Sequence, residues 1–284
     1  MSKVRIVVDS TADLSEEERS QLNIEMVPLK VHFGEETFLD SITINSEQFF
    51  QKLEQSKDMP STSQPSPADF VDIYRKLLDE ADAPILSIHI SSALSGTYQS
   101  ATIAKSMLED DPRITIVDSK SASVGFGFGA KHAAKLAASG ADVNECLKTF
   151  QRINQGSKLY FLVETLDYLQ RNGRIGKASA LFGSLLSIKP ILSIDTEGTI
   201  YPVDRIRGSR KAMSRVVELL DQDFQGRKVN INIAHANALP AAEQFASMLG
   251  EKLAVASISY NELGPVIGAH VGPGTLGVLC SPLE

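Results

Sequence analysis

Cysteine is scarce in this sequence, and its two cysteines form no familiar metal-binding motif. Cys146 and Cys280 are the only ones among 284 residues, and they lie far apart, outside any C-x-x-C pattern. The five histidines likewise show no metal-ligand spacing. This usage gives no zinc signature and fits a reducing compartment. We therefore expect no metal site.

Further absences narrow the class of function. No run of about 18 apolar residues occurs, which argues against a membrane-spanning helix. The net charge is −7, so there is no excess of positive charge to suggest nucleic-acid binding. No G-x-x-x-x-G-K-[ST] motif occurs, which excludes a P-loop kinase. Because MSKVRIVVDS leads straight into a predicted strand, we expect no signal peptide and a cytoplasmic protein.

The chain does contain alternating strand-like and helix-like segments. Hydrophobic residues make up 43% and charged residues 22%, which predicts an ordered core. Strands are predicted over 4–8, 24–33, 84–90, 113–119, 158–163, 188–195, 199–206, 228–235, 253–259 and 275–280. Helices are predicted after the capping residues Ser15 and Ser66, after the turn at 90–96, and over 46–55, 124–138, 142–154, 209–222 and 239–249.

This order predicts an α/β fold with two α/β domains and mostly parallel sheets. Glu197-Gly198 should join two strands as an antiparallel hairpin, and Pro28 predicts an edge strand or a bulge within 24–33. We place the domain boundary at QGSK, giving domains 1–156 and 157–284. Ligands in such folds bind at the carboxyl ends of the strands or in a cleft between the domains.

Asp9 follows the first predicted strand, in VVDSTAD, where some phosphotransfer enzymes place a nucleophile. Enzymes of the haloacid dehalogenase type need a second acid two residues later, but that position holds Thr11, and the next acid is Asp13. The spacing favours turn formation and helix capping.

The stretch GFGFGA, residues 125–130, matches the spacing of a dinucleotide-binding turn. Such a motif needs an acid about 20 residues later at a strand end, whereas Glu145 lies in a predicted helix. Small residues at this spacing instead favour close helix packing.

Hydroxyl groups crowd the predicted turn of ISSALSGTYQSA, residues 90–101, where Ser95 is expected either to cap the next helix or to border an anion site. Thr62 and Ser63 lie in an expected extended loop, and His270 lies in the glycine-rich loop GPVIGAHVGPG. Together they offer hydroxyls and an imidazole without an adjacent Lys or Arg. That donor set suits a single carboxylate better than a triphosphate.

The motifs VDSTADL, TSQPSP, ISSALSGTYQSA, LDYLQRNGRIG and GPVIGAHVGPG occur in this order, and over essentially its whole length the chain resembles the DegV family. These are fatty-acid-binding proteins that serve as the lipid-presenting subunit of bacterial fatty acid kinase. The resemblance implies a buried fatty acid in a tunnel between two α/β domains. It further implies that Thr62, Ser95 and His270 hold the carboxylate. Ser91 and Ser92 lie close to Ser95, and we keep Ser92 and Gly96 as candidate ligand contacts.

The resemblance also implies partners and an absence of chemistry in this chain. An ATP-dependent kinase subunit of the dihydroxyacetone-kinase type would convert the bound acid to an acyl phosphate. An acyltransferase would use this product for phospholipid synthesis, and the carrier would contact the membrane transiently. No cofactor and no complete active site are expected here.

Basic stretches at 170–177 and 204–211 are either a solvated face or a surface for the kinase or for anionic lipid headgroups, and Arg174 and Arg207 are our candidates for docking. The apolar stretch 180–192 is a candidate tunnel lining or ordinary core. Two alternatives stay open: a stand-alone phosphatase or hydrolase acting through Asp9, and a carrier of another amphipathic acid.

Overall fold

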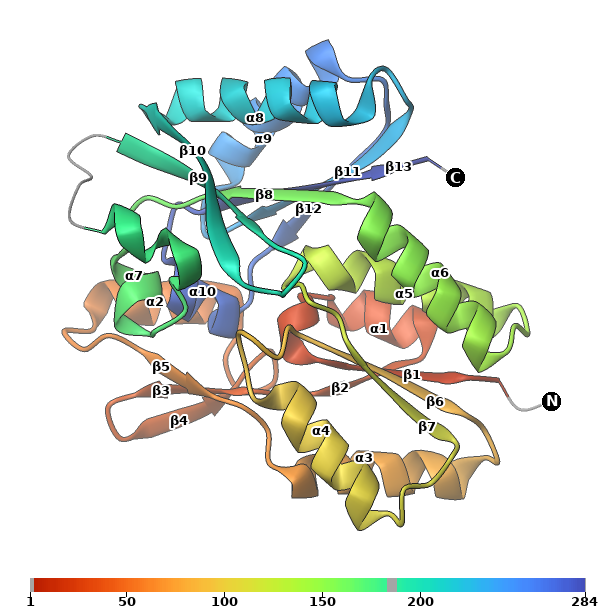
Figure 1. Cartoon of the computed structure of the whole chain (residues 1–284). Coiled ribbons are helices and arrows are strands. Elements are labelled where there is room, and N and C mark those ends of the chain that lie inside the picture. The colour runs from red at the N-terminus through yellow and green to blue at the C-terminus, as the bar shows by residue number, and fades with distance from the viewer. Residues whose placement is uncertain (1–2, 183–187, 284) are drawn as a thin grey trace.

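The computed structural model describes residues 3–182 and 188–283. Its layers alternate between helices and sheets (Figure 1). Helices α8 (Ser209–Phe224) and α9 (Leu239–Lys252) cover one face of a six-stranded sheet, and helices α1 (Glu16–Leu22), α5 (Val124–Ala138) and α6 (Val143–Gly156) lie between that sheet and a four-stranded sheet. Helix α10 (Pro265–Val271) packs instead on a small third sheet. Helices α3 (Pro67–Glu80) and α4 (Thr97–Met107) cover the outer face of the four-stranded sheet. The predicted α/β class is thus confirmed.

The four-stranded sheet is parallel throughout, as predicted. Its order is β2 (Ile24–Val27), β1 (Arg5–Asp9), β6 (Ile85–His89) and β7 (Ile114–Asp118). These strands are short and rich in β-branched residues, and β1, β2 and β6 are mostly buried while the edge strand β7 is partly buried, as expected for a parallel sheet covered on both faces.

The six-stranded sheet corrects the expectation of mostly parallel strands. Its order is β10 (Ile200–Arg207), β9 (Ile188–Ile194), β8 (Lys158–Leu162), β13 (Leu276–Pro282), β11 (Val229–His235) and β12 (Val255–Glu262). Among its described strands, only β11 and β12 pair in parallel. The last strand, β13, inserts between β8 and β11 and runs antiparallel to both, while β9 and β10 form the predicted hairpin.

A small third sheet explains the segment around Pro28. The predicted strand 24–33 is in fact two strands, β2 and β3 (Lys30–Phe33), that belong to different sheets. Proline lacks the N–H needed to continue a ladder, and the chain crosses between the sheets at this point. Strand β3 pairs with β4 (Glu36–Leu39) and with β5 (Ser61–Ser63), so the expected extended loop at Thr62 is a strand.

The helices mostly match their predicted ranges. They are α1 (Glu16–Leu22), α2 (Ser46–Gln55), α3 (Pro67–Glu80), α4 (Thr97–Met107), α5 (Val124–Ala138), α6 (Val143–Gly156), α7 (Asp167–Arg171), α8 (Ser209–Phe224), α9 (Leu239–Lys252) and α10 (Pro265–Val271). Capping boxes at Ser15 and Ser66 begin α1 and α3 as predicted. The prediction of a glycine-rich loop around His270 is wrong, because most of that segment forms helix α10.

The glycines of α5 confirm the packing interpretation of GFGFGA. A Cβ on Gly127 would lie 2.2 Å from the carbonyl oxygen of Ala12, and one on Gly129 would lie 2.9 Å from Phe150. The motif therefore sits within a helix and allows α5 to approach η1 (Ser10–Ala12) and α6 closely.

The two faces of the six-stranded sheet belong to different cores. Tyr160, Leu162 and Val278 face the cluster built with α8 and α9. Phe161 and Leu279 belong to the cluster shared with α5 and the four-stranded sheet. This second face is therefore the one that meets the N-terminal part of the chain.

Helix α6 ends at Gly156 and β8 begins at Lys158, while one hydrophobic cluster includes residues from both sides of this junction. The division into domains 1–156 and 157–284 stays a prediction. In the part of the chain that the structure describes, no helix is long and apolar enough to cross a membrane.

Candidate ligand pocket

A largely apolar pocket lies between the inner face of the six-stranded sheet and the carboxyl ends of the parallel strands. It spans about 820 Å³ of empty space, part of which is open to solvent. Its apolar lining includes Leu29, Ile90, Leu94, Leu159, Phe161, Leu169, Ile194, Ile200, Ala234, Leu263, Val266 and Ile267. Its polar lining is Thr62, Ser95, Ser123, Arg174, His270 and Thr275.

Thr62 and His270 meet in this lining. The Oγ1 atom of Thr62, on β5, lies 2.8 Å from Nε2 of His270, in the last turn of α10. Burial, with the positive charge of Arg174, lowers the pKa of His270 to about 4, so the ring is neutral near pH 7. Its Nδ1 atom is buried and has no hydrogen-bond partner among the described residues. A hydrogen-bonding ligand would satisfy an imidazole of this kind.

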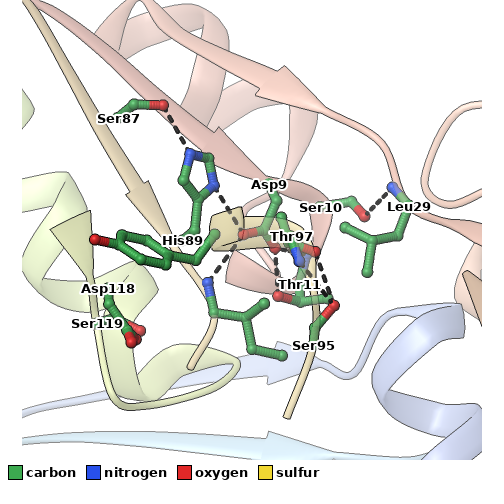
Figure 2. A network of polar contacts seen from close by, with 12 residues as sticks. Asp9, Ser10, Thr11, Leu29, Ser87, His89, Ser95, Thr97, Asp118 and Ser119 are labelled. Carbon is green, nitrogen blue, oxygen red and sulfur yellow. Dashed lines mark hydrogen bonds and ion pairs between the residues drawn. The ribbon is translucent and has the colours of Figure 1, made fainter. Parts of the chain in front are cut away.

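Ser95 reaches the same pocket from the turn between β6 and α4. The predicted N-cap is wrong by one position, because α4 begins at Thr97 and Gly96 is its N-cap, without a side-chain bond. Ser95 Oγ instead lies 2.8 Å from Thr97 Oγ1, and Figure 2 draws this contact as a dashed line. The Ser95 hydroxyl is half-buried at the pocket, where it can also donate a hydrogen bond to an anion.

Arg174 was predicted to dock a partner at the surface, but the structure places it in the pocket lining. Its Nε donates to the carbonyl oxygen of Leu94 at 3.0 Å, and its Nη1 donates to that of Asn172 at 2.7 Å. Asn172 in turn donates to the carbonyl of Ala269 at 3.0 Å, beside His270. These bonds to backbone hold a positive charge near the imidazole in the pocket lining.

The remaining predicted site residues lie outside this lining. Ser92 is exposed: its backbone N–H donates to Asp118, and its hydroxyl accepts from Lys120 at 3.4 Å, so the structure does not bring it to the pocket. Gly96 is half-buried against Gln64. Arg207 is exposed at the end of β10.

Ser91, the other neighbour of Ser95, is fully buried, and its hydroxyl donates to the carbonyl of Gly198 in the hairpin turn at 2.9 Å. In the candidate lining segment 180–192, residues 183–187 lie outside the described residues. None of its described residues lines the pocket, and Leu192 belongs to the core.

Asp9 is a structural residue with no access for a substrate. Its side chain is fully buried, and both of its oxygens accept hydrogen bonds (Figure 2). Thr11 donates to Oδ1 through N–H and hydroxyl, and Ile90 N–H donates to Oδ2 at 2.9 Å. His89 Nδ1 lies 3.1 Å from Oδ2. The geometry matches the predicted turn-forming role and disfavours a nucleophile.

The network extends inward from His89. Because a carboxylate only accepts, His89 Nδ1 donates to Asp9, and Nε2 then accepts from Ser87 Oγ at 2.7 Å. Tyr74 donates to Ser87 at 2.8 Å. These buried groups satisfy one another, as a core network must.

A pair of buried acids, which the sequence did not single out, anchors helix α10. Asp13 accepts from the Gly264 N–H at 3.0 Å and from the Ser123 hydroxyl. Asp40 accepts from Ser10 at 2.7 Å and from the Val266 N–H. Burial raises the pKa of Asp13 well above its usual range and that of Asp40 to about 6. Two acids thus face the helix end opposite His270.

Comparison with known proteins identifies the family. A family model described as "Uncharacterised protein, DegV family" matches residues 3–283. The chain belongs to the DegV family. Protein DegV of Bacillus subtilis is 38% identical over 277 residues, covering 97% of this chain and 98% of that protein. A DegV domain-containing protein of Halalkalibacterium halodurans is 37% identical over 279 residues, covering 98% of each.

Solved DegV structures share the fold. A fatty-acid-binding DegV family protein from Thermus thermophilus superimposes with a TM-score of 0.92 at 36% identity, over 99% of this chain and all (100%) of that one. DegV of Bacillus subtilis, a fatty acid binding protein, gives 0.87 at 36% identity, over 100% of both chains. A stearic acid-binding protein from Eubacterium ventriosum gives 0.89 at 26% identity, over 98% of both chains.

Proposed function

We propose that this DegV protein binds one long-chain fatty acid with its acyl chain in the apolar pocket. Thr62, Ser95 and His270 hold the carboxylate, and Arg174 supplies the positive charge. The observation that carries the proposal is the shape of one site: a long apolar lining with donors gathered in it and with a neutral, incompletely bonded imidazole among them. The solved relatives described as fatty-acid-binding support it.

The energetics favour a lipid over a small polar acid. Burying about fourteen methylenes at roughly 0.8 kcal/mol each contributes about 11 kcal/mol before the cost of association. The apolar lining therefore provides most of the affinity. The hydroxyls, imidazole and guanidinium fix the orientation of the carboxylate, because a buried anion needs hydrogen bonds and a counter-charge.

We further propose that the protein is a cytoplasmic carrier that presents this carboxylate to a separate ATP-dependent kinase. A carboxylate oxygen would attack the γ-phosphoryl group of ATP held by the kinase, forming an acyl phosphate and releasing ADP. An acyltransferase would then use the acyl phosphate for phospholipid synthesis. The carrier's own polar groups include hydroxyls and a neutral imidazole that orient the acid, which suits a protein that leaves phosphoryl transfer to its partner.

The deciding experiment is mass spectrometry of the freshly purified protein, first native and then after organic extraction. We expect a mass excess that extracts as one or a few long-chain fatty acids. A ligand-free mass that persists after incubation with fatty acids would overturn the proposal. Extraction of a different amphipathic acid would favour the alternative carrier, which the same pocket would accommodate.

A further inference from the structure

Gly277 lies within β13, where glycine weakens a strand because it has no side chain to pack. Its partners across the sheet are Phe161 on β8 and Ala234 on β11. All three residues line the pocket. These three paired residues therefore form part of the pocket wall, and Gly277, which has no side chain, lies at the centre of that part.

The backbone does not require glycine at this position. Gly277 is not among the residues with positive φ, and β13 pairs with both neighbours without a register shift. A Cβ placed on Gly277 would lie 3.7 Å from Cβ of Ala234 and 3.8 Å from Cβ of Phe161. Both distances are ordinary van der Waals contacts, so a methyl group would fit without displacing the fold.

The other buried glycines of ordinary φ have a different role. Among the described residues, a Cβ would come within 3.0 Å of another atom at Gly125, Gly127, Gly129, Gly264 and Gly268. At those glycines a side chain would clash with a neighbouring atom, so the absent side chain permits a close approach. At Gly277 the absent side chain instead widens the pocket.

We infer that Gly277 is a specificity-determining residue that admits long acyl chains across the wall formed by β8, β13 and β11. The inference rests on the proposed fatty-acid function. Thr275 Oγ1 donates to the carbonyl of Val271 at 3.0 Å, which ties the start of β13 to the helix end that bears His270. A strand rises about 3.3 Å per residue, so Gly277 lies roughly 7 Å further along and meets methylenes rather than the carboxylate.

The test compares Gly277→Ala and Gly277→Val with the wild type. Dissociation constants for decanoic, tetradecanoic and octadecanoic acid are measured by displacement of a fluorescent fatty acid. Gly277→Val is expected to weaken the binding of octadecanoic acid most and that of decanoic acid least. The dissociation constant should rise by about fourfold for each methylene group that the pocket can no longer bury. Gly250→Ala is the control, since Gly250 is at an exposed position of α9 where a Cβ would meet nothing within 4 Å. Equal losses for all three acids, or none, would overturn the inference.

A second readout separates this inference from the proposed function. Without ligand, Gly277→Ala should unfold at a higher temperature. The methyl group fills empty space in the folded protein, and alanine lowers the conformational entropy of the unfolded chain relative to glycine. A lower midpoint would show that the space is absent and would overturn the inference even if the wild type binds fatty acid. If the wild type binds none of the acids, the proposed function fails and the chain-selecting role of Gly277 fails with it.

Discussion

Thr62 and His270, 208 positions apart in the chain, share a hydrogen bond of 2.8 Å in the wall of an apolar pocket. One comes from a short edge strand and the other from the last turn of a short helix. Because each side chain orients the other, the pair acts as one unit toward a ligand. This coupling determines how its variants should behave.

Thr62→Val and His270→Gln should each weaken fatty-acid binding by about tenfold or more, because each removes a hydrogen bond to a charged group worth about 1.5–3 kcal/mol. The double variant should lose less than the sum of the two effects. Displacement of a fluorescent fatty acid measures the affinities. Thr37→Val is the matched control, since Thr37 Oγ1 bonds His32 at 2.9 Å outside the pocket. Wild-type affinity in both variants would remove this pair from the site.

Arg174→Gln should abolish the preference for a fatty acid over the fatty alcohol of equal length, because the positive charge that favours the carboxylate is lost. The pKa of His270 should also rise from about 4, since Arg174 helps to lower it. Displacement assays with both ligands and NMR titration of the imidazole measure the two effects. An unchanged preference for the acid over the alcohol would show that Arg174 does not contribute to recognition of the carboxylate.

Arg207→Ala should leave fatty-acid affinity unchanged, because the residue is exposed at the end of β10 and lies outside the pocket lining. If Arg207 meets the kinase, acyl-phosphate formation with the kinase added should slow several-fold. Lys228→Ala, at an exposed position before β11, is a control for loss of one surface charge. Turnover equal to that of the control would contradict the docking role.

Asp9→Asn should act on stability rather than on a reaction. The change disturbs a buried carboxylate that accepts from His89, Ile90 and Thr11, and a cost of about 2–4 kcal/mol in the free energy of unfolding is expected. Tyr74→Phe, at the far end of the network, should cost about 1 kcal/mol. Urea denaturation measures both. Phosphate-ester hydrolysis by the purified wild type that disappears in Asp9→Asn would contradict this interpretation.

Asp40 should make the protein less stable as the pH rises from about 4 to above 6. Its folded-state pKa, about 6, exceeds the usual aspartate value of 3.8, because burial disfavours the charged form, so the folded protein holds the proton more tightly. Its stabilising contribution is therefore complete at low pH and lost as the pH rises through 6, by an amount on the order of 3 kcal/mol. Asp40→Asn should remove this dependence, so the stability of the variant relative to wild type should increase between pH 4 and pH 7. Urea titrations across that range, with exposed Asp58→Asn as control, provide the check. A difference in unfolding free energy between Asp40→Asn and wild type that does not change with pH would be inconsistent with a buried acid of raised pKa.

Local features were the predictable part of this fold. The capping boxes at Ser15 and Ser66 and the helix at 46–55 depend on neighbours within a few residues, and all three are confirmed. Strand order depends on distant partners, so the insertion of β13 between β8 and β11 could not be read from the chain. Helix α10 was mistaken for a loop because Gly268 is there for packing: a Cβ would lie 2.9 Å from Phe49.

The site divides in the same way. Thr62, Ser95 and His270 carry chemistry visible in their residue types and motifs, and the structure places all three in one pocket lining. Arg174 looked like a surface charge, because nothing local indicates that the carbonyls of Leu94 and Asn172 would hold it at the pocket. Pocket-facing apolar residues resemble core residues in sequence, since both alternate along buried strands.

That alternation has a consequence for how the family can diversify. Thr275 and Gly277 contribute to the pocket, while Leu276 and Val278, which alternate with them, pack beneath α8 and α9. Two independent tasks are therefore interleaved along one strand, and point substitutions can alter the first without disturbing the second. Inserting a single residue would turn the pocket-facing side chains toward α8 and α9 and the others toward the pocket. We expect ligand preference among relatives to change by replacement at alternate positions, with the length of this strand held constant.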